Sequence, residues 1–228
     1  SPGIISILHT WGQDMSFHPH VHCIVSGGGV VEEKGEAMYW KKEQRTKHDF
    51  LIPKAILQDV FKAYYLKQLR KMLAEGALKY PKDAAFSLEK ILETIGYKQW
   101  NVYAKKPVGG PKQVLECLGR YTHKVVITAH RILSIDAERQ TITFKYKDYH
   151  KRGTKDEEQV MTLSIPEFIR RYEQHFLPKG YVKIRNYGYL RNHKKGERMR
   201  ALFRLLHLPP APPKVQIPAS QRPLEQPG

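Results

Sequence analysis

Four histidines lie within 14 residues near the start of the chain, in the stretch HTWGQDMSFHPHVHCIVSGGG (residues 9–29). They are His9, His18, His20 and His22. Neutral imidazole is the commonest metal ligand in proteins. Three imidazoles that leave one coordination position open are typical of a catalytic metal site rather than a closed structural one. The stretch therefore predicts a metal site.

The spacing of the histidines selects three of them as ligands. His18, His20 and His22 have a period of two, so in a strand they face one side, and the outer pair is about 13 Å apart. That distance is too long for one ion. A hairpin centred near residues 14–15 places His9 opposite His20 on the same face, with Cβ atoms about 5 Å apart. We predict His9, His20 and His22 as the metal ligands and expect His18 to steer the loop or contact phosphate.

Two further residues of the predicted turn remain open as the third ligand. Gln13 and Asp14 both carry side-chain oxygens and lie next to the predicted centre of the hairpin. Either could replace His9 if the register of the hairpin differed.

The elements that must position these residues follow from periodicity and turn residues. We expect strands at Ile4–Trp11 and Phe17–Ser26, the second ended by Gly27–Gly29. The period then changes to helical. Further strands are expected at 37–42, 100–107, near 125–135, 141–147, 159–164 and 181–190. Helices are expected from Pro53 to Gly76 and at 84–95, 111–124, 165–176 and 193–207, the last capped by Asn192. The fold class is α+β, an antiparallel sheet with helices packed on it.

The charge of the chain predicts a polyanionic partner. Lys and Arg number 39 against 22 Asp and Glu, which gives a formal net charge of +17 over 228 residues. Such an excess favours nucleic acid, and 13 tyrosines and three tryptophans offer rings on which unpaired bases can stack. A generic basic surface is the alternative.

Other features narrow the class of protein. Two cysteines, Cys23 and Cys117, make no disulfide framework, which is typical of the cytoplasm. No apolar run of 18 residues and no signal peptide is seen, so no membrane partner is predicted. The last 21 residues hold seven prolines, and we expect 208–228 to be a disordered tail.

Three blocks in order resemble the bacterial rolling-circle insertion-sequence transposases of the HUH superfamily. They are LHTWGQDMSFHPHVHCIVSGGG (8–29), CLGRYTHKVVITAHRI (117–132) and VKIRNYGYL (182–190). The resemblance runs from about residue 3 to about residue 207, and the pair His20 and His22 around a hydrophobic residue matches the HUH motif. The spacing from His9 to His20 is similar to the placement of the third histidine in conjugative relaxases of this superfamily.

The resemblance implies a nucleophile. Enzymes of this superfamily attack a DNA phosphate with a tyrosine, which becomes linked to the 5′ phosphate. Members carry two tyrosines four residues apart on one helix, or a single one. Tyr121 matches the second position, whereas Cys117 stands at the first, which leaves open a strand exchange that needs two covalent links in one subunit. The cofactor implied by phosphate chemistry is Mg²⁺ or Mn²⁺, although three histidines would also accept Zn²⁺, Co²⁺ or Ni²⁺.

Basic residues around these blocks are predicted to bind DNA by holding phosphates in register. A solvated basic face is the alternative for the second region. Tyr187 and Tyr189 could stack on bases or pack internally. The predicted DNA-binding residues are Arg120, Lys124, Arg131, Lys183, Arg185 and Arg191, with Lys194, Lys195, Arg198 and Arg200 in the same basic region.

The function predicted is that of a transposase of a mobile element, which nicks and joins single-stranded or hairpin DNA at transposon ends in a bacterial, nucleoid-associated setting. The resemblance implies a longer protein with a cysteine-rich zinc-binding segment, so we expect residues 1–207 to be an N-terminally truncated HUH domain. A missing first strand would fit this truncation. The alternatives are a non-catalytic single-stranded nucleic-acid-binding protein and a histidine-metal hydrolase acting on small substrates. The oligomeric state is not predicted.

Overall fold

A computed structural model gives the structure of the chain, which divides into two compact units, residues 1–42 with 110–228 and residues 43–109. The predicted boundary between a domain at 1–207 and a tail at 208–228 stays a prediction, because most of that tail lies outside the described residues. The structure describes residues 1–31, 39–42, 51–78, 88–105, 110–122, 124–148, 151, 153 and 157–210.

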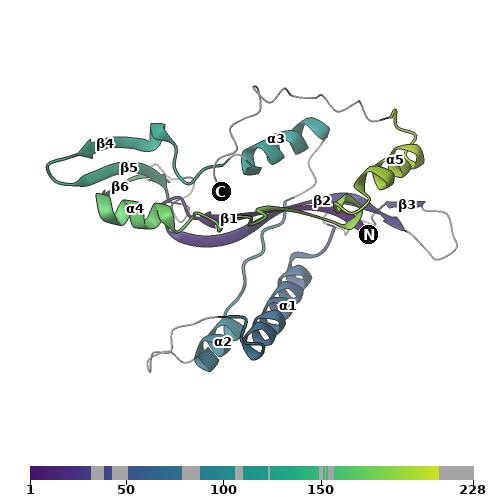
Figure 1. Cartoon of the computed structure of the whole chain (residues 1–228), viewed down its shortest axis with the longest axis horizontal. Coiled ribbons are helices and arrows are strands. Elements are labelled where there is room, and N and C mark those ends of the chain that lie inside the picture. Colours follow the sequence, from purple (N-terminus) through teal and green to yellow (C-terminus); the bar gives the residue numbers. More distant parts are fainter. Residues whose placement is uncertain are drawn as a thin grey trace. The chain divides into compact units, whose positions relative to one another are not determined.

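The first unit contains a four-stranded antiparallel sheet in the order β3-β2-β1-β7 (Figure 1). Its long central hairpin consists of β1 (Pro2–Trp11) and β2 (Phe17–Val31). The edge strands are β3 (Tyr39–Lys42) and β7 (Ile184–Tyr187). The predicted α+β class with antiparallel strands is confirmed.

The register of the hairpin agrees with the prediction. His9 lies opposite His20 and Ile7 lies opposite His22. The predicted end of the second strand at Gly27–Gly29 is wrong, because β2 continues through these glycines to Val31 and pairs there with β3. Glycine at position 28 allows the Trp40 ring to pack directly on the strand, because a Cβ there would lie 2.5 Å from that ring.

A second antiparallel sheet has the order β4-β5-β6, with β4 at Ile132–Asp136, β5 at Thr141–Lys147 and β6 at Glu158–Ser164. The 3₁₀ turn η1 (Ala129–Arg131) leads into β4, so the strand expected near 125–135 begins later than predicted. The helix α4 (Ile165–Glu173) follows directly, capped by the Ser164 hydroxyl, which accepts a hydrogen bond from the Glu167 amide.

The core joins the turn of the hairpin to the second sheet. Trp11 and Met15 pack with Val126 and Phe144, and Met15 and Phe144 are fully buried. Burying such side chains stabilises a fold by about 1.5–3 kcal/mol each. The end of the hairpin next to His9 is therefore held in a fixed place.

Two more helices belong to this unit, α3 (Pro111–Thr122) and α5 (Lys195–Leu205). The predicted Asn192 cap is wrong: Lys194 is the N-cap residue, in a left-handed conformation and without a capping side chain. The strand predicted at 181–190 is short, since β7 ends at Tyr187 and the 3₁₀ turn η4 (Gly188–Leu190) follows. Gly188 has a positive φ of 62° and lies against the Pro2 carbonyl, where a Cβ cannot fit.

The second unit contains α1 (Lys54–Ala74) and α2 (Leu88–Tyr97). The strand predicted at 100–107 is wrong for residues 100–105, which form no regular element, and 106–107 lie outside the described residues. Trp100 packs against Tyr65 of α1 with ring centroids 5.0 Å apart, and its indole donates to the Ile95 carbonyl of α2. Among the described helices, none is long and apolar enough to cross a membrane.

Candidate metal and tyrosine site

The three predicted ligands converge on one face of the hairpin. Ring centroids are 5.6 Å apart for His9 and His20, 4.7 Å for His9 and His22, and 4.9 Å for His20 and His22. One nitrogen from each ring lies within 4.8 Å of the others. This separation suits three ligands around a single ion.

Two backbone carbonyls fix which nitrogen each ring offers. His20 Nδ1 donates to the His18 carbonyl at 2.7 Å, which leaves Nε2 as the ligand atom. His9 Nε2 donates to the Tyr121 carbonyl at 2.7 Å, which leaves Nδ1. Metal-binding histidines commonly use their second nitrogen in this way.

The unpaired nitrogens of the site fit a metal ion. His9 Nδ1 and His22 Nε2 are buried and have no hydrogen-bond partner among the described residues. An unpaired buried polar atom destabilises a fold by about 1–3 kcal/mol. Two such atoms at one point therefore need an explanation. A cation bound by both nitrogens would supply it.

Electrostatics keep these rings in the form that binds metal. Burial lowers the pKa of His9, and the charge of Lys183 lowers it further, against the opposing effect of the Tyr121 carbonyl. Burial also lowers the pKa of His20. For His22, burial and the charges of its neighbours lower the pKa to about 4. A neutral imidazole carries the lone pair that a metal needs.

Tyr121 lies directly on the triad. It belongs to the last turn of α3, and its ring stacks on His22 at a centroid distance of 4.0 Å and an angle of 18°. Its ring centroid is 6.1 Å from that of His9. Cys117, four residues earlier and so on the same side of the helix, is a half-buried free thiol.

The predicted DNA-binding residues separate into groups. Lys124 and Lys183 adjoin the triad: the charge of Lys124 lowers the pKa of all three histidines, and the Lys183 ammonium lies 5.2 Å from the centre of the Trp11 ring. Arg120 is exposed on α3. Arg185 pairs with Ser6, so strand alternation places it on the face opposite the triad. Arg191 follows η4, at the other end of β1.

Arg131 and Asp14 have structural partners. The Arg131 guanidinium donates to the carbonyls of Lys145, Val126 and Gln13. The Asp14 carboxylate accepts from the Ser16 amide and hydroxyl, and Asp14 does not belong to the cluster of possible metal ligands among the described residues. The alternative ligand Asp14 therefore lies elsewhere than the triad.

One residue that supports the site, His175, carried no signal in the sequence pattern. His175 follows α4 and is 7% exposed. Its Nε2 donates to the Met15 carbonyl at 3.1 Å, and its Nδ1 shares a hydrogen bond with the Thr10 hydroxyl at 3.1 Å. His175 thus connects both sides of the turn that separates His9 from His20.

We expect His175→Ala to lower the free energy of unfolding by about 2–4 kcal/mol, because it leaves a cavity and two buried groups without a partner. It should also weaken Mn²⁺ binding. Urea unfolding and calorimetry measure both. His193→Ala, which removes an exposed imidazole, is the matched control and should change stability by less than about 0.5 kcal/mol. Wild-type stability in His175→Ala would contradict this role.

Comparison with known proteins agrees with the geometry. An antiparallel α+β fold with a histidine triad and an adjoining helical tyrosine is that of the HUH class. A family model described as "Putative transposase" matches residues 3–198. The chain belongs to this transposase family, and the resemblance drawn from its motifs is confirmed.

Two curated relatives extend the match. The chain is 36% identical over 226 residues to "Putative transposase y4qJ" of Sinorhizobium fredii, covering 96% of the chain and 54% of the relative. It is 26% identical over 210 residues to "Transposase for insertion sequence element IS801" of Pseudomonas savastanoi pv. phaseolicola, covering 90% of the chain and 47% of the relative. The chain thus spans about half the length of these relatives. No solved structure matches it.

Proposed function

We propose that this chain is the strand-cleaving part of a rolling-circle transposase, which nicks and joins single-stranded DNA through a 5′-phosphotyrosine. The observation that carries the proposal is the stacking of Tyr121 on His22, beside two buried imidazole nitrogens that have no other partner. The proposed nucleophile and the proposed metal ligands lie together at one point of the fold.

The proposed step is a transesterification. The Tyr121 oxygen attacks the phosphorus and loses its proton to solvent, a new P–O bond forms, and the bond from phosphorus to the 3′ oxygen breaks. The 3′ oxygen leaves with a proton as a hydroxyl. Attack by a free 3′ hydroxyl on the phosphotyrosine reverses the step and joins strands. No water is consumed, so the energy of the phosphodiester is conserved.

The residues of the site have separate parts in this step. His9, His20 and His22 would hold a divalent ion, Mg²⁺ or Mn²⁺. A bound ion of this kind polarises the phosphate and stabilises the charge that develops on it. Lys124 and Lys183, which adjoin the triad, would pair with phosphates of the bound strand.

A hydrogen bond connects the residue proposed as nucleophile, Tyr121, to the proposed ligand His9. The Tyr121 carbonyl, one of the carbonyls left free at the end of α3, accepts from His9 Nε2. The end of the helix and the ligand therefore move together, which keeps the phenol near the triad. Such fixed positioning is a large part of phosphoryl-transfer catalysis.

A covalent adduct tests the proposal. We expect labelled single-stranded or hairpin DNA, incubated with the protein and Mn²⁺, to give a slowly migrating band on a denaturing gel that protease removes. Duplex DNA of the same sequence should give far less. Binding without any adduct, across a panel of single-stranded substrates, would instead support the non-catalytic nucleic-acid-binding protein.

The cytoplasmic localisation of the chain stays a prediction.

A further inference from the structure

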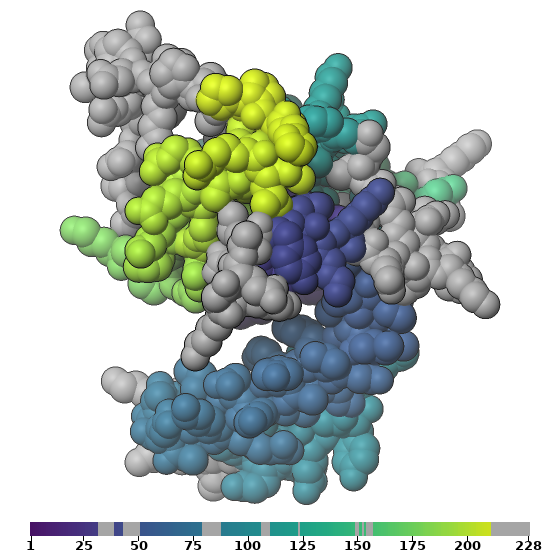
Figure 2. Space-filling model, turned by 90° about the vertical axis from the view of Figure 1, so that its right-hand side faces the viewer, coloured from purple at the N-terminus to yellow at the C-terminus, as the bar shows by residue number. Residues whose placement is uncertain are grey.

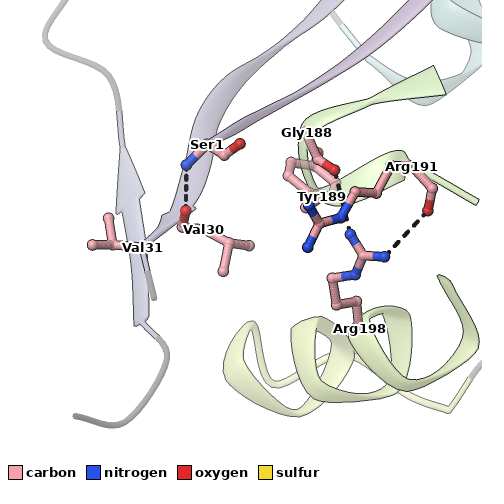
Figure 3. A pocket seen from close by; sticks show the side chains of 7 residues that line it. All are labelled: Ser1, Val30, Val31, Gly188, Tyr189, Arg191 and Arg198. Atoms are coloured by element: carbon pink, nitrogen blue, oxygen red, sulfur yellow. Dashed lines mark hydrogen bonds between the residues drawn. The ribbon is translucent and has the colours of Figure 1, made fainter. Parts of the chain in front are cut away.

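A second basic site lies at the opposite end of the hairpin from the triad. It is a pocket of about 300 Å³ formed where η4 and the start of α5 meet the ends of β1 and β2 (Figure 3). Arg191 and Arg198 point toward one another there, beside Tyr189. The described residues that line the pocket include no carboxylate: they are Ser1, Val30, Val31, Gly188, Tyr189, Arg191 and Arg198.

Backbone contacts hold the guanidinium group of Arg198 in place. Arg198 donates to the carbonyls of Gly188 at 3.5 Å and Arg191 at 3.4 Å, which holds α5 against the turn. Arg198 is half-buried, whereas Arg191 is exposed. Two guanidinium groups that line one pocket repel one another, and an anion between them offsets this repulsion. Their planar donors match the oxygens of a phosphate.

Aromatic rings next to the pocket rest on glycines. The Tyr189 ring lies over Gly3, and the Trp40 ring lies over Gly28, in each case where a Cβ would be closer than 3 Å. The two rings meet edge to face, with centroids 5.8 Å apart. The site therefore combines cations with rigid aromatic surface, which is the combination that single-stranded nucleic acid binds.

The pocket and the triad share one side of the sheet. Tyr121 of α3 stacks on the histidine face, and α3 and α5 lie on the same side of the four-stranded sheet (Figure 1). Figure 2 shows α5, in yellow, beside β3, in dark blue, at the pocket end. From Pro2 to His9 the strand rises about 23 Å, so a DNA strand several nucleotides long can reach both.

We propose that the pocket binds a phosphodiester of the same single DNA strand that the triad engages, several nucleotides away from the reacting bond. The inference rests on the proposed function for the identity of the strand. It adds a second anchor, formed by Arg191 and Arg198, which sets the length of DNA that is bound productively.

Binding to oligonucleotides of two lengths tests the anchor. The protein carries Tyr121→Phe in every arm, so that no adduct forms and only binding is measured. Arg191→Gln leaves the donors of Arg198 in place. We expect it to weaken binding of a 15-nucleotide strand about tenfold and to lower the salt slope by about 0.7, with little effect on a four-nucleotide strand.

The matched control lies on the same helix. Arg204→Gln removes one positive charge from an exposed position of α5 outside the pocket, and we expect less than a twofold effect on either strand. Arg198→Lys keeps the charge but removes the planar pair of guanidinium donors. It should weaken binding of the long strand alone, by less than Arg191→Gln does. Melting temperatures identify any variant that is unfolded.

Two outcomes would overturn the anchor. One is an equal loss for short and long strands in Arg191→Gln, and the other is an equal loss in Arg191→Gln and Arg204→Gln, which would indicate generic charge. A failure of the proposed function looks different: the length-dependent loss would persist, whereas the protein with Tyr121 intact would form no adduct.

Discussion

Tyr121→Phe is expected to abolish the covalent DNA adduct while the protein stays folded. The substitution removes one oxygen, and the ring that stacks on His22 remains. The carbonyl that accepts from His9 belongs to the backbone and is unchanged. Loss of a nucleophile costs on the order of 10⁴-fold or more in rate, so the band on a denaturing gel should vanish. Mn²⁺ binding and single-strand affinity should stay within about twofold of wild type.

Matched variants exclude other tyrosines. Tyr187 and Tyr189 lie in the third resembling block, and Tyr187→Phe and Tyr189→Phe should retain the adduct. Peptide mapping of the trapped product gives the attachment site directly. DNA found on any tyrosine other than Tyr121, or an undiminished adduct in Tyr121→Phe, would show that the nucleophile is misassigned.

The hairpin and its cluster of three histidines were predictable from sequence because the rule behind them is local. A period of two places alternate residues on one face, and the position of a short turn sets the register. Given a centre near residues 14–15, His9 must lie opposite His20. The structure has this register, and the cluster of His9, His20 and His22 follows from it.

The supports of the site could not be predicted, because they depend on contacts between distant parts of the chain. The bond from His9 to the Tyr121 carbonyl spans 112 residues, and the bond from His175 to the Met15 carbonyl spans 160. A backbone carbonyl is present at every residue, so sequence does not mark the one that orients a ligand. The division of the strands between two sheets was missed for the same reason.

The elements that were predicted wrongly show how packing overrides local signals. Gly27–Gly29 are usual strand breakers, yet β2 continues through them, because the Trp40 ring lies over Gly28 and β3 pairs alongside. Residues 100–105 are rich in strand-forming side chains, but Trp100 instead packs on α1 and donates to α2. In both cases an indole ring decides the local structure.

The metal site gives the second large effect. We expect His22→Ala to weaken Mn²⁺ binding more than about 100-fold, beyond the 10–100-fold typical of residues that only support a ligand. His20→Ala should do the same, since its Nε2 is directed into the site by the His18 carbonyl. His18→Ala keeps that carbonyl and is the matched control. Calorimetric titration measures all three, and undiminished binding in His20→Ala would contradict the site.

The pH dependence of that binding follows from the lowered pKa values. An ordinary histidine has a pKa of about 6.5, so at pH 6 most of its rings are protonated and must release protons to bind metal. The pKa of His22 is about 4, and burial lowers those of His9 and His20. His22 is therefore already neutral at pH 6, and His9 and His20 are neutral to a greater extent than ordinary histidines at that pH. We expect Mn²⁺ affinity to fall less between pH 7 and pH 6 than it would for three ordinary histidines.

Proton release measures this directly. Titration with Mn²⁺ at pH 6 in two buffers of different ionisation enthalpy gives the number of protons released, and we expect this number to be smaller than for ordinary histidines. Three ligands with ordinary pKa values would instead release about two protons in total. A release of that size would show that burial does not hold these imidazoles neutral, even if the three histidines are the ligands. A chelator that removes the ion gives the metal-free protein. The free energy of unfolding of this metal-free protein should fall as the pH is lowered from about 6.5 toward 4, because the unfolded chain binds protons that the buried histidines of the folded protein do not bind.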